Sequence, residues 1–253
     1  MKFRYFIDVI VTLSMKDFKI RYRNSMLGFI WSLLNPLAYM VILWFVFSRL
    51  LTPSIPNFAA WILIGILIWR FFAQGTTQGL YSLLSNPSLV GKIYLPRFMI
   101  VLSNNVANLL GASLEFAALI PVLILLGISL NAYMLFLPIL LAAECLLVFA
   151  LSLSLSSLTL RYRDFHQLWD IALQLGFFLS PIVYDVHMVP VRYRSLYELN
   201  PVTLLIDQTR TIFLSGGLPS AFSSVVLFAT ILVLLGSGYL IFTRLEGTFA
   251  DKL

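Results

Sequence analysis

The residues of this chain that could do chemistry are few, and they stand far apart. Arg70, Glu115, Glu144 and Asp170 each interrupt or border a stretch of apolar residues. A charge in such surroundings is costly unless it meets water, a partner or lipid headgroups. These side chains therefore either take part in function or pair with one another between helices, and the sequence leaves that choice open.

The motifs of metal, nucleophilic and nucleotide chemistry are missing. His166 and His187 stand alone, without the spacing of metal ligands or of a nucleophile and its base. The Gly91-Lys92 pair looks like the end of a phosphate-binding loop, but Ile93 stands where that loop requires Ser or Thr. We therefore predict no catalytic residue, no metal site and no cofactor held by this chain itself.

The composition is that of a membrane protein. Of the 253 residues, 60% are apolar and only 11% are charged, whereas soluble domains keep about 25% charged residues. The single Cys145 excludes an internal disulfide. The net charge of +6 does not indicate a nucleic-acid partner, because most Lys and Arg residues flank apolar runs. We predict a single all-α polytopic domain over residues 1–253, embedded in a lipid bilayer.

The positions of the apolar runs predict the helices. A hydrocarbon core of about 30 Å needs roughly 20 helical residues. Six spans are expected, at about residues 28–51, 58–84, 100–128, 133–160, 167–184 and 221–242.

Two further segments are expected to lie outside the spans. Residues 2–23 alternate with helical periodicity between an apolar face, which includes Phe6, Ile10 and Leu13, and a charged face. This pattern is typical of an amphipathic helix in the headgroup plane. Residues 185–217 are too polar and too interrupted to span. Since basic residues gather at the N-terminus and in alternate loops, both termini are predicted to be cytoplasmic.

Two segments of the sequence resemble segments of one protein family. Arg21-Tyr22-Arg23, Leu27-Gly28 and Asn35-Pro36 look like the opening of the membrane subunits of type-2 ABC exporters for cell-surface polysaccharides, which export O-antigen, capsule and teichoic-acid polymers. A second segment is similar to that family's coupling segment, placed here at residues 85–97. Its matching residues are Asn86, Pro87, Leu89, Val90, Lys92, Tyr94, Pro96 and Arg97.

The resemblance implies a mechanism. Residues 85–97 would carry a short cytoplasmic helix that docks on a separate ATPase, and we expect Leu89 and Val90 to lie in that contact. Two copies of the chain would form the channel, and two copies of the ATPase would bind ATP and Mg²⁺. The cargo would be a polysaccharide, O-antigen-like and lipid-linked, crossing the inner membrane. The cytoplasmic entrance would include Arg21, Tyr22, Arg23, Leu27 and Gly28.

Aromatic and charged side chains supply candidate path and gate residues. Sugar rings pack on flat apolar surfaces, so the candidates for the substrate path are Tyr39, Trp31, Trp44, Trp61, Trp69 and Phe72. The alternative is an interfacial aromatic belt, which suits tryptophans near span ends. The family places short re-entrant helices before the last span. There, Asp207 and Arg210 are three residues apart and could pair on a helix to form an extracytoplasmic gate.

Other classes of protein remain as alternatives. A type-2 exporter of a small molecule or lipid would share the motifs. A transporter or channel without an ATPase would require a charge relay through the spans, and four scattered charges give it little support. A membrane enzyme would require an acidic or metal cluster at one membrane face, which the sequence does not offer.

Overall fold

The fold is helical throughout the part of the chain that the structure describes. This computed structural model describes residues 2–22, 29–50, 55–92, 95–162, 164–247 and 249. The elements are α1 (Lys2–Tyr22), α2 (Phe29–Leu50), α3 (Phe58–Tyr81), α4 (Pro87–Lys92), α5 (Phe98–Leu125), η1 (Ala132–Phe136), α6 (Leu137–Arg161), α7 (Phe165–Leu179), η2 (Val186–Met188), α8 (Val191–Leu199), α9 (Pro201–Arg210), η3 (Thr211–Ser215) and α10 (Ala221–Glu246).

Five of the described helices are long and apolar enough to cross a membrane, namely α2, α3, α5, α6 and α10. Their bounds lie close to five of the predicted spans, and the all-α polytopic fold is confirmed. Two connecting residues have positive φ: Gly127 follows the end of α5, and Asn57 directly precedes α3.

The span expected at 167–184 is shorter in the structure. α7 has 15 residues, which at 1.5 Å per residue is about 22 Å. The helix ends because Pro181 follows Ser180, and a residue before proline is driven out of the helical region; Ser180 has φ −91° and ψ 143°. A complete crossing by this segment stays a prediction.

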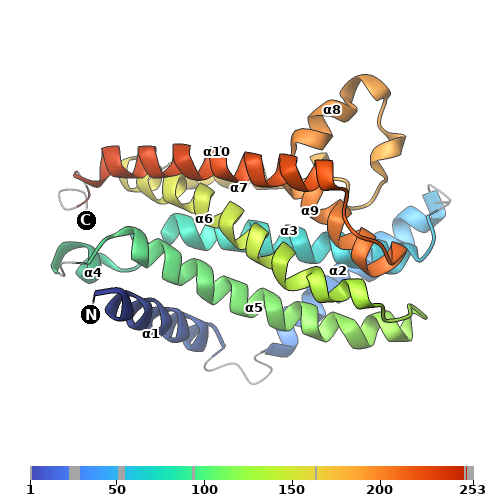
Figure 1. Ribbon diagram of the computed structural model, residues 1–253, viewed down its shortest axis with the longest axis horizontal. Helices are drawn as coiled ribbons and strands as arrows, with labels where there is room; N and C mark the ends of the chain where they lie inside the picture. The colour runs from blue at the N-terminus through green and yellow to red at the C-terminus, as the bar shows by residue number, and fades with distance from the viewer. Residues whose placement is uncertain are drawn as a thin grey trace.

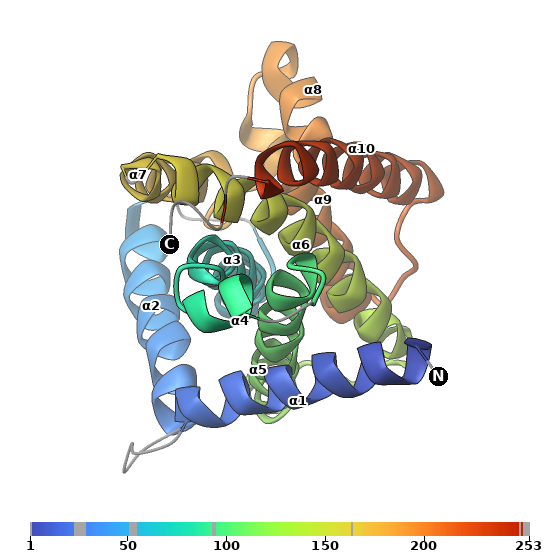
Figure 2. The ribbon, with the colours of Figure 1, turned by 90° about the vertical axis from the view of Figure 1, so that its left-hand side faces the viewer.

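Helix α3 lies at the centre of the bundle, with α5 and α6 beside it (Figures 1 and 2). Small residues let these helices approach closely. A Cβ added to Gly79 of α3 would collide with the Ser152 side chain of α6, and one added to Gly238 of α10 would collide with the carbonyl oxygen of Ala150. Helix α2 lies at one side of the bundle, and only 11% of the residues in its apolar membrane-spanning stretch are buried.

The beginning of α1, the end of α10 and α4 lie at the same end of the bundle (Figure 1). Helix α1 lies across that end, beneath α5 (Figure 2). Its residues Phe6, Ile10 and Leu13 pack on a cluster of buried side chains of the same chain. The apolar face of α1 thus contacts protein.

Candidate functional sites

The main candidate binding site is a groove between α2, α3 and α7. Its volume is about 550 Å³. Four aromatic side chains line it, Tyr39, Trp69, Phe177 and Phe178, and three amides accompany them. The amide residues are Asn35, Gln74 and Gln174. A surface that combines ring faces with amide donors and acceptors can hold a ligand that has both apolar faces and hydroxyl groups.

The aromatic wall of this groove is fixed by ring packing. The ring centroids of Trp69 and Phe177 are 6.0 Å apart at an interplanar angle of 78°, an edge-to-face contact. Behind them, the centroids of Phe72 and Trp169 are 6.4 Å apart, and the Trp169 indole N–H donates to Thr76 at 3.2 Å. α7 approaches this closely because it has Gly176 there, where a Cβ would lie 2.7 Å from the Trp69 ring.

Arg70 joins three helices at the edge of the groove. Its Nη1 donates to the Asn35 side chain of α2 at 3.1 Å, and its Nη2 lies 3.5 Å from the Glu115 carboxylate of α5. The structure therefore supports inter-helix pairing for Arg70 and Glu115. Glu144 is fully buried, and neither carboxylate oxygen has a hydrogen-bond partner in the described part of the chain, whereas Asp170 is exposed.

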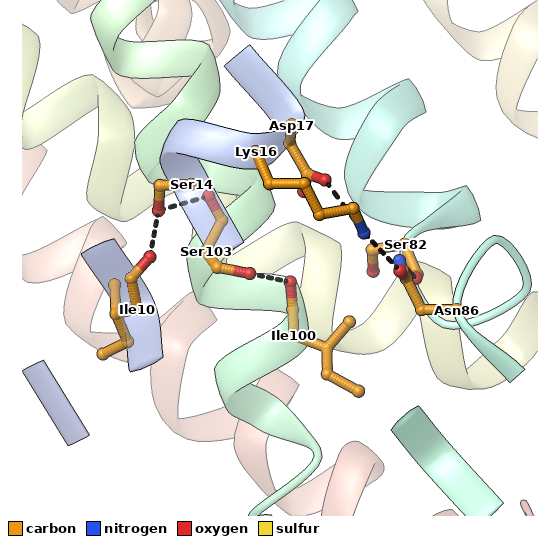
Figure 3. Close-up of polar contacts among 8 residues, drawn as sticks. All are labelled: Ile10, Ser14, Lys16, Asp17, Ser82, Asn86, Ile100 and Ser103. Atoms are coloured by element: carbon orange, nitrogen blue, oxygen red, sulfur yellow. Dashed lines mark hydrogen bonds and ion pairs between the residues drawn. The ribbon is translucent and has the colours of Figure 1, made fainter. Parts of the chain in front are cut away.

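The short helix α4 is held from the side of α1. The Asn86 side chain donates to the Ser82 carbonyl at 2.9 Å and accepts a hydrogen bond from Lys16 of α1 at 3.4 Å (Figure 3). Nearby, the Ser14 hydroxyl donates to the Ser103 carbonyl at 2.9 Å. Partial burial raises the pKa of Asp17 on the same helix, while its neighbour Lys16 opposes that shift.

The two faces of α4 differ. Val90 is 3% exposed, so it does not face outward as expected, and the half-buried Leu89 packs against the same cluster. A contact of Leu89 with an ATPase stays a prediction. The exposed residues are Pro87, Ser88 and Gly91. This happens because apolar side chains in a short helix fill the chain's own core first, where burial removes them from water.

The segment before the last span is built around a buried arginine. Arg210 is 3% exposed. Its guanidinium donates to the backbone carbonyls of Trp61, Pro181 and Ile182 at 2.7–3.2 Å. It also lies 3.8 Å from the centroid of the Trp61 ring. Asp207 is exposed, and no ion pair joins it to Arg210 within this described segment. The predicted pair is therefore wrong as a contact.

Comparisons with known proteins identify the family to which this chain belongs. The ABC-2 type transporter family matches residues 8–214. The chain belongs to this family. Its relatives include the O-antigen export system permease protein RfbA of Klebsiella pneumoniae, 30% identical over 98% of this chain and 96% of the relative. They also include RfbA of Myxococcus xanthus, 27% identical over 97% and 95%. The polysialic acid transport protein KpsM of Escherichia coli is 21% identical over 81% and 80%.

Not all predicted path residues of this ABC-2 permease meet in one place. Tyr39 and Trp69 line the groove, and Phe72 packs behind Trp69. Trp31 and Trp44 are exposed on α2 away from the groove lining, and Trp61 packs on Arg210.

Several groove residues were not predicted. Phe177 and the amides of Gln74 and Gln174 belong to the lining. A signal was present, since amides inside apolar helices are uncommon and prefer partners or water. The sequence could not show that α7 lies beside α3, so this signal could not be combined with the aromatic residues.

The entrance motif of this ABC-2 permease is only partly described. Arg21 of α1 donates to Asn108 of α5 at 3.2 Å and to Gln78 of α3, so this cation holds α1 against two helices. Four of the predicted entrance and coupling residues lie outside the described ranges, namely Arg23, Leu27, Gly28 and Tyr94. The side chains of Tyr22 and Lys92 also lie outside the described part of the chain.

Proposed function

We propose that this ABC-2 permease exports a cell-surface polysaccharide, O-antigen-like and lipid-linked, across the cytoplasmic membrane. The observation that carries the proposal is the match to O-antigen export permeases over nearly the whole chain. A match of this extent includes the helices that line the groove as well as the short segments between them. Another relative is named a capsule polysaccharide export inner-membrane protein, from Neisseria meningitidis.

The groove supports a carbohydrate cargo. Tyr39 is 56% exposed and offers a ring face, while Trp69 and Phe177 form a second apolar wall. The amides of Asn35, Gln74 and Gln174 can exchange hydrogen bonds with hydroxyls that pass over them. Polymer movement requires many weak, replaceable contacts, and a mixed aromatic and amide surface supplies them.

A homodimer would complete the path. Helix α2 is little buried in the single chain, and it lines one side of the groove through Asn35 and Tyr39. Two copies that place their α2 and α7 sides together would enclose a channel lined by both grooves. The 185–217 segment would then stand at the outer end as the gate, held in position by Arg210.

Energy would come from a separate ATPase, two copies of which bind ATP and Mg²⁺. Helix α4 lies at the end of the bundle that also holds the basic helix α1 and the end of α10. This arrangement supports cytoplasmic termini. We name α4 the coupling helix. Its exposed edge, Pro87, Ser88 and Gly91, is the surface available to the ATPase.

Deletion of the gene in its host tests the proposal. Surface polysaccharide should disappear and lipid-linked polymer should accumulate inside the cell, because synthesis continues without export. Complementation with the wild-type chain should restore the surface polymer. Unchanged surface polysaccharide, with loss of a small molecule or lipid from the outside instead, would refute the proposed cargo.

A further inference from the structure

We propose that Arg97 is a positioning residue that joins the coupling helix α4 to the C-terminal end of α10, so that both move as one body. The inference rests on the proposed function, since it concerns how ATPase motion enters the permease. The family resemblance placed Arg97 with the ATPase contact. The structure points its side chain toward the chain's own last helix.

Within the described residues, Arg97 contacts two other helices of its own chain. Its Nη1 donates to the backbone carbonyl of Glu246 at 2.6 Å, and its Nε donates to the carbonyl of Val90 at 3.4 Å. The guanidinium carbon lies 5.8 Å from the centroid of the Phe249 ring. One side chain thus contacts Val90 of α4, the end of α10 at Glu246, and Phe249 three residues beyond it, while its own backbone begins α5.

These contacts suit arginine in particular. The guanidinium has several donors in a rigid plane and can stack on an aromatic ring, whereas a lysine ammonium is a compact charge on a flexible stem. Only 24% of the Arg97 side chain is exposed. The Glu246 carboxylate is 4.0 Å away, so the short contact is the one to the backbone carbonyl.

Apolar packing continues the same connection. Val90 of α4 belongs to a buried cluster with Phe242 of α10 and Phe249. The two phenylalanine rings meet edge to face, with centroids 5.4 Å apart. A close-packed cluster transmits displacement because it cannot be compressed. A push on α4 would therefore reach α10, and through its close contact at Gly238 it would reach α6.

The test compares variants in the purified complex of the chain with its ATPase. Arg97→Ala and Arg97→Lys should still bind the ATPase and permit ATP hydrolysis. Export per ATP hydrolysed should fall by roughly tenfold for Arg97→Ala, the value of one charge-assisted hydrogen bond in an equilibrium, and by less for Arg97→Lys. Glu246→Gln is the matched control and should export normally, because the carbonyl acceptor remains.

A covalent link supplies a second, independent readout. Replacing Arg97 and Phe249 by cysteine, in a Cys145→Ser background, removes the contacts between Arg97 and the end of α10. This double replacement should uncouple hydrolysis from export. Joining the two cysteines with a short bifunctional thiol reagent should restore export, because the link replaces the arginine contact. A structural role of Arg97 in folding alone would not produce this recovery.

Three results would overturn the inference. They are normal coupling in Arg97→Ala, loss of ATPase binding in both Arg97 variants, and a complete cross-link that restores no export. The proposed function fails separately, if the wild-type complex exports no polysaccharide. If the wild-type complex exports polysaccharide and Arg97→Ala exports as much per ATP hydrolysed, only the role of Arg97 is refuted.

Discussion

Replacement of Arg210 by methionine tests how the segment before the last span is held. The change keeps an apolar stem of similar length but removes every donor of the guanidinium. The carbonyls of Trp61, Pro181 and Ile182, which accept from Arg210 at 2.7–3.2 Å, would lose their partners. Helix α9 would then be attached to α3 and to the turn after α7 by apolar packing alone.

The magnitude follows from these contacts. An unsatisfied buried acceptor costs about 1–3 kcal/mol, so three carbonyls give roughly 3–9 kcal/mol. Removal of a buried charge offsets part of that loss, and we expect a net destabilisation of about 3 kcal/mol for Arg210→Met. Arg210→Lys keeps a donor but loses the stacking on Trp61, which contributes about 0.5–2 kcal/mol, so its loss should be smaller.

Asp207→Asn is the control that separates the two interpretations of this segment. Since Asp207 is exposed and makes no ion pair with Arg210, its replacement should leave stability within about 0.5 kcal/mol of wild type. Denaturation of the purified chain in detergent, followed by tryptophan fluorescence, measures all three variants. Equal destabilisation by Asp207→Asn and Arg210→Met would refute the stabilisation of this segment by hydrogen bonds from Arg210 to the three carbonyls. It would instead support an ion pair between Asp207 and Arg210.

Two further predictions concern the groove and the coupling helix. Trp69→Ala should reduce polysaccharide export several-fold, because it removes one aromatic wall of the groove. Trp31→Ala changes a residue outside the groove lining and should export normally. An equal loss of surface polymer in both variants would count against the groove as the path. Ser88→Arg should weaken ATPase binding in pull-downs of a folded chain, whereas Val90→Asp should lower the chain's thermal stability because the new charge is buried; unchanged ATPase binding in Ser88→Arg would exclude that edge as the contact.

The spans could be predicted because length and apolar composition are local properties of the chain. The end of α7 could have been placed better, since Pro181 forces Ser180 out of the helix. The partner of Arg210 could not, because the carbonyls it binds come from α3 and from the turn after α7, far away in sequence. The same limit applied to Val90, whose burial depends on residues of α5 and α10.

The groove shows the same boundary between local and tertiary information. Tyr39 and Trp69 could be named as aromatic residues inside apolar helices, yet Trp31 and Trp44 have the same local character and lie elsewhere. Only the packing of α7 on α3 through Gly176 selects Trp69 and adds Phe177. Residue type therefore predicted the kind of surface, and helix packing decided its members.

Transport in proteoliposomes tests the central claim most directly. The chain and its ATPase would be reconstituted with lipid-linked polysaccharide, and polymer that becomes protected inside the vesicles would be measured with and without ATP and Mg²⁺. We expect protection of polymer that depends on ATP hydrolysis and on both subunits, and we expect Trp69→Ala to reduce it. ATP hydrolysis by the assembled complex without any movement of polymer would contradict the account.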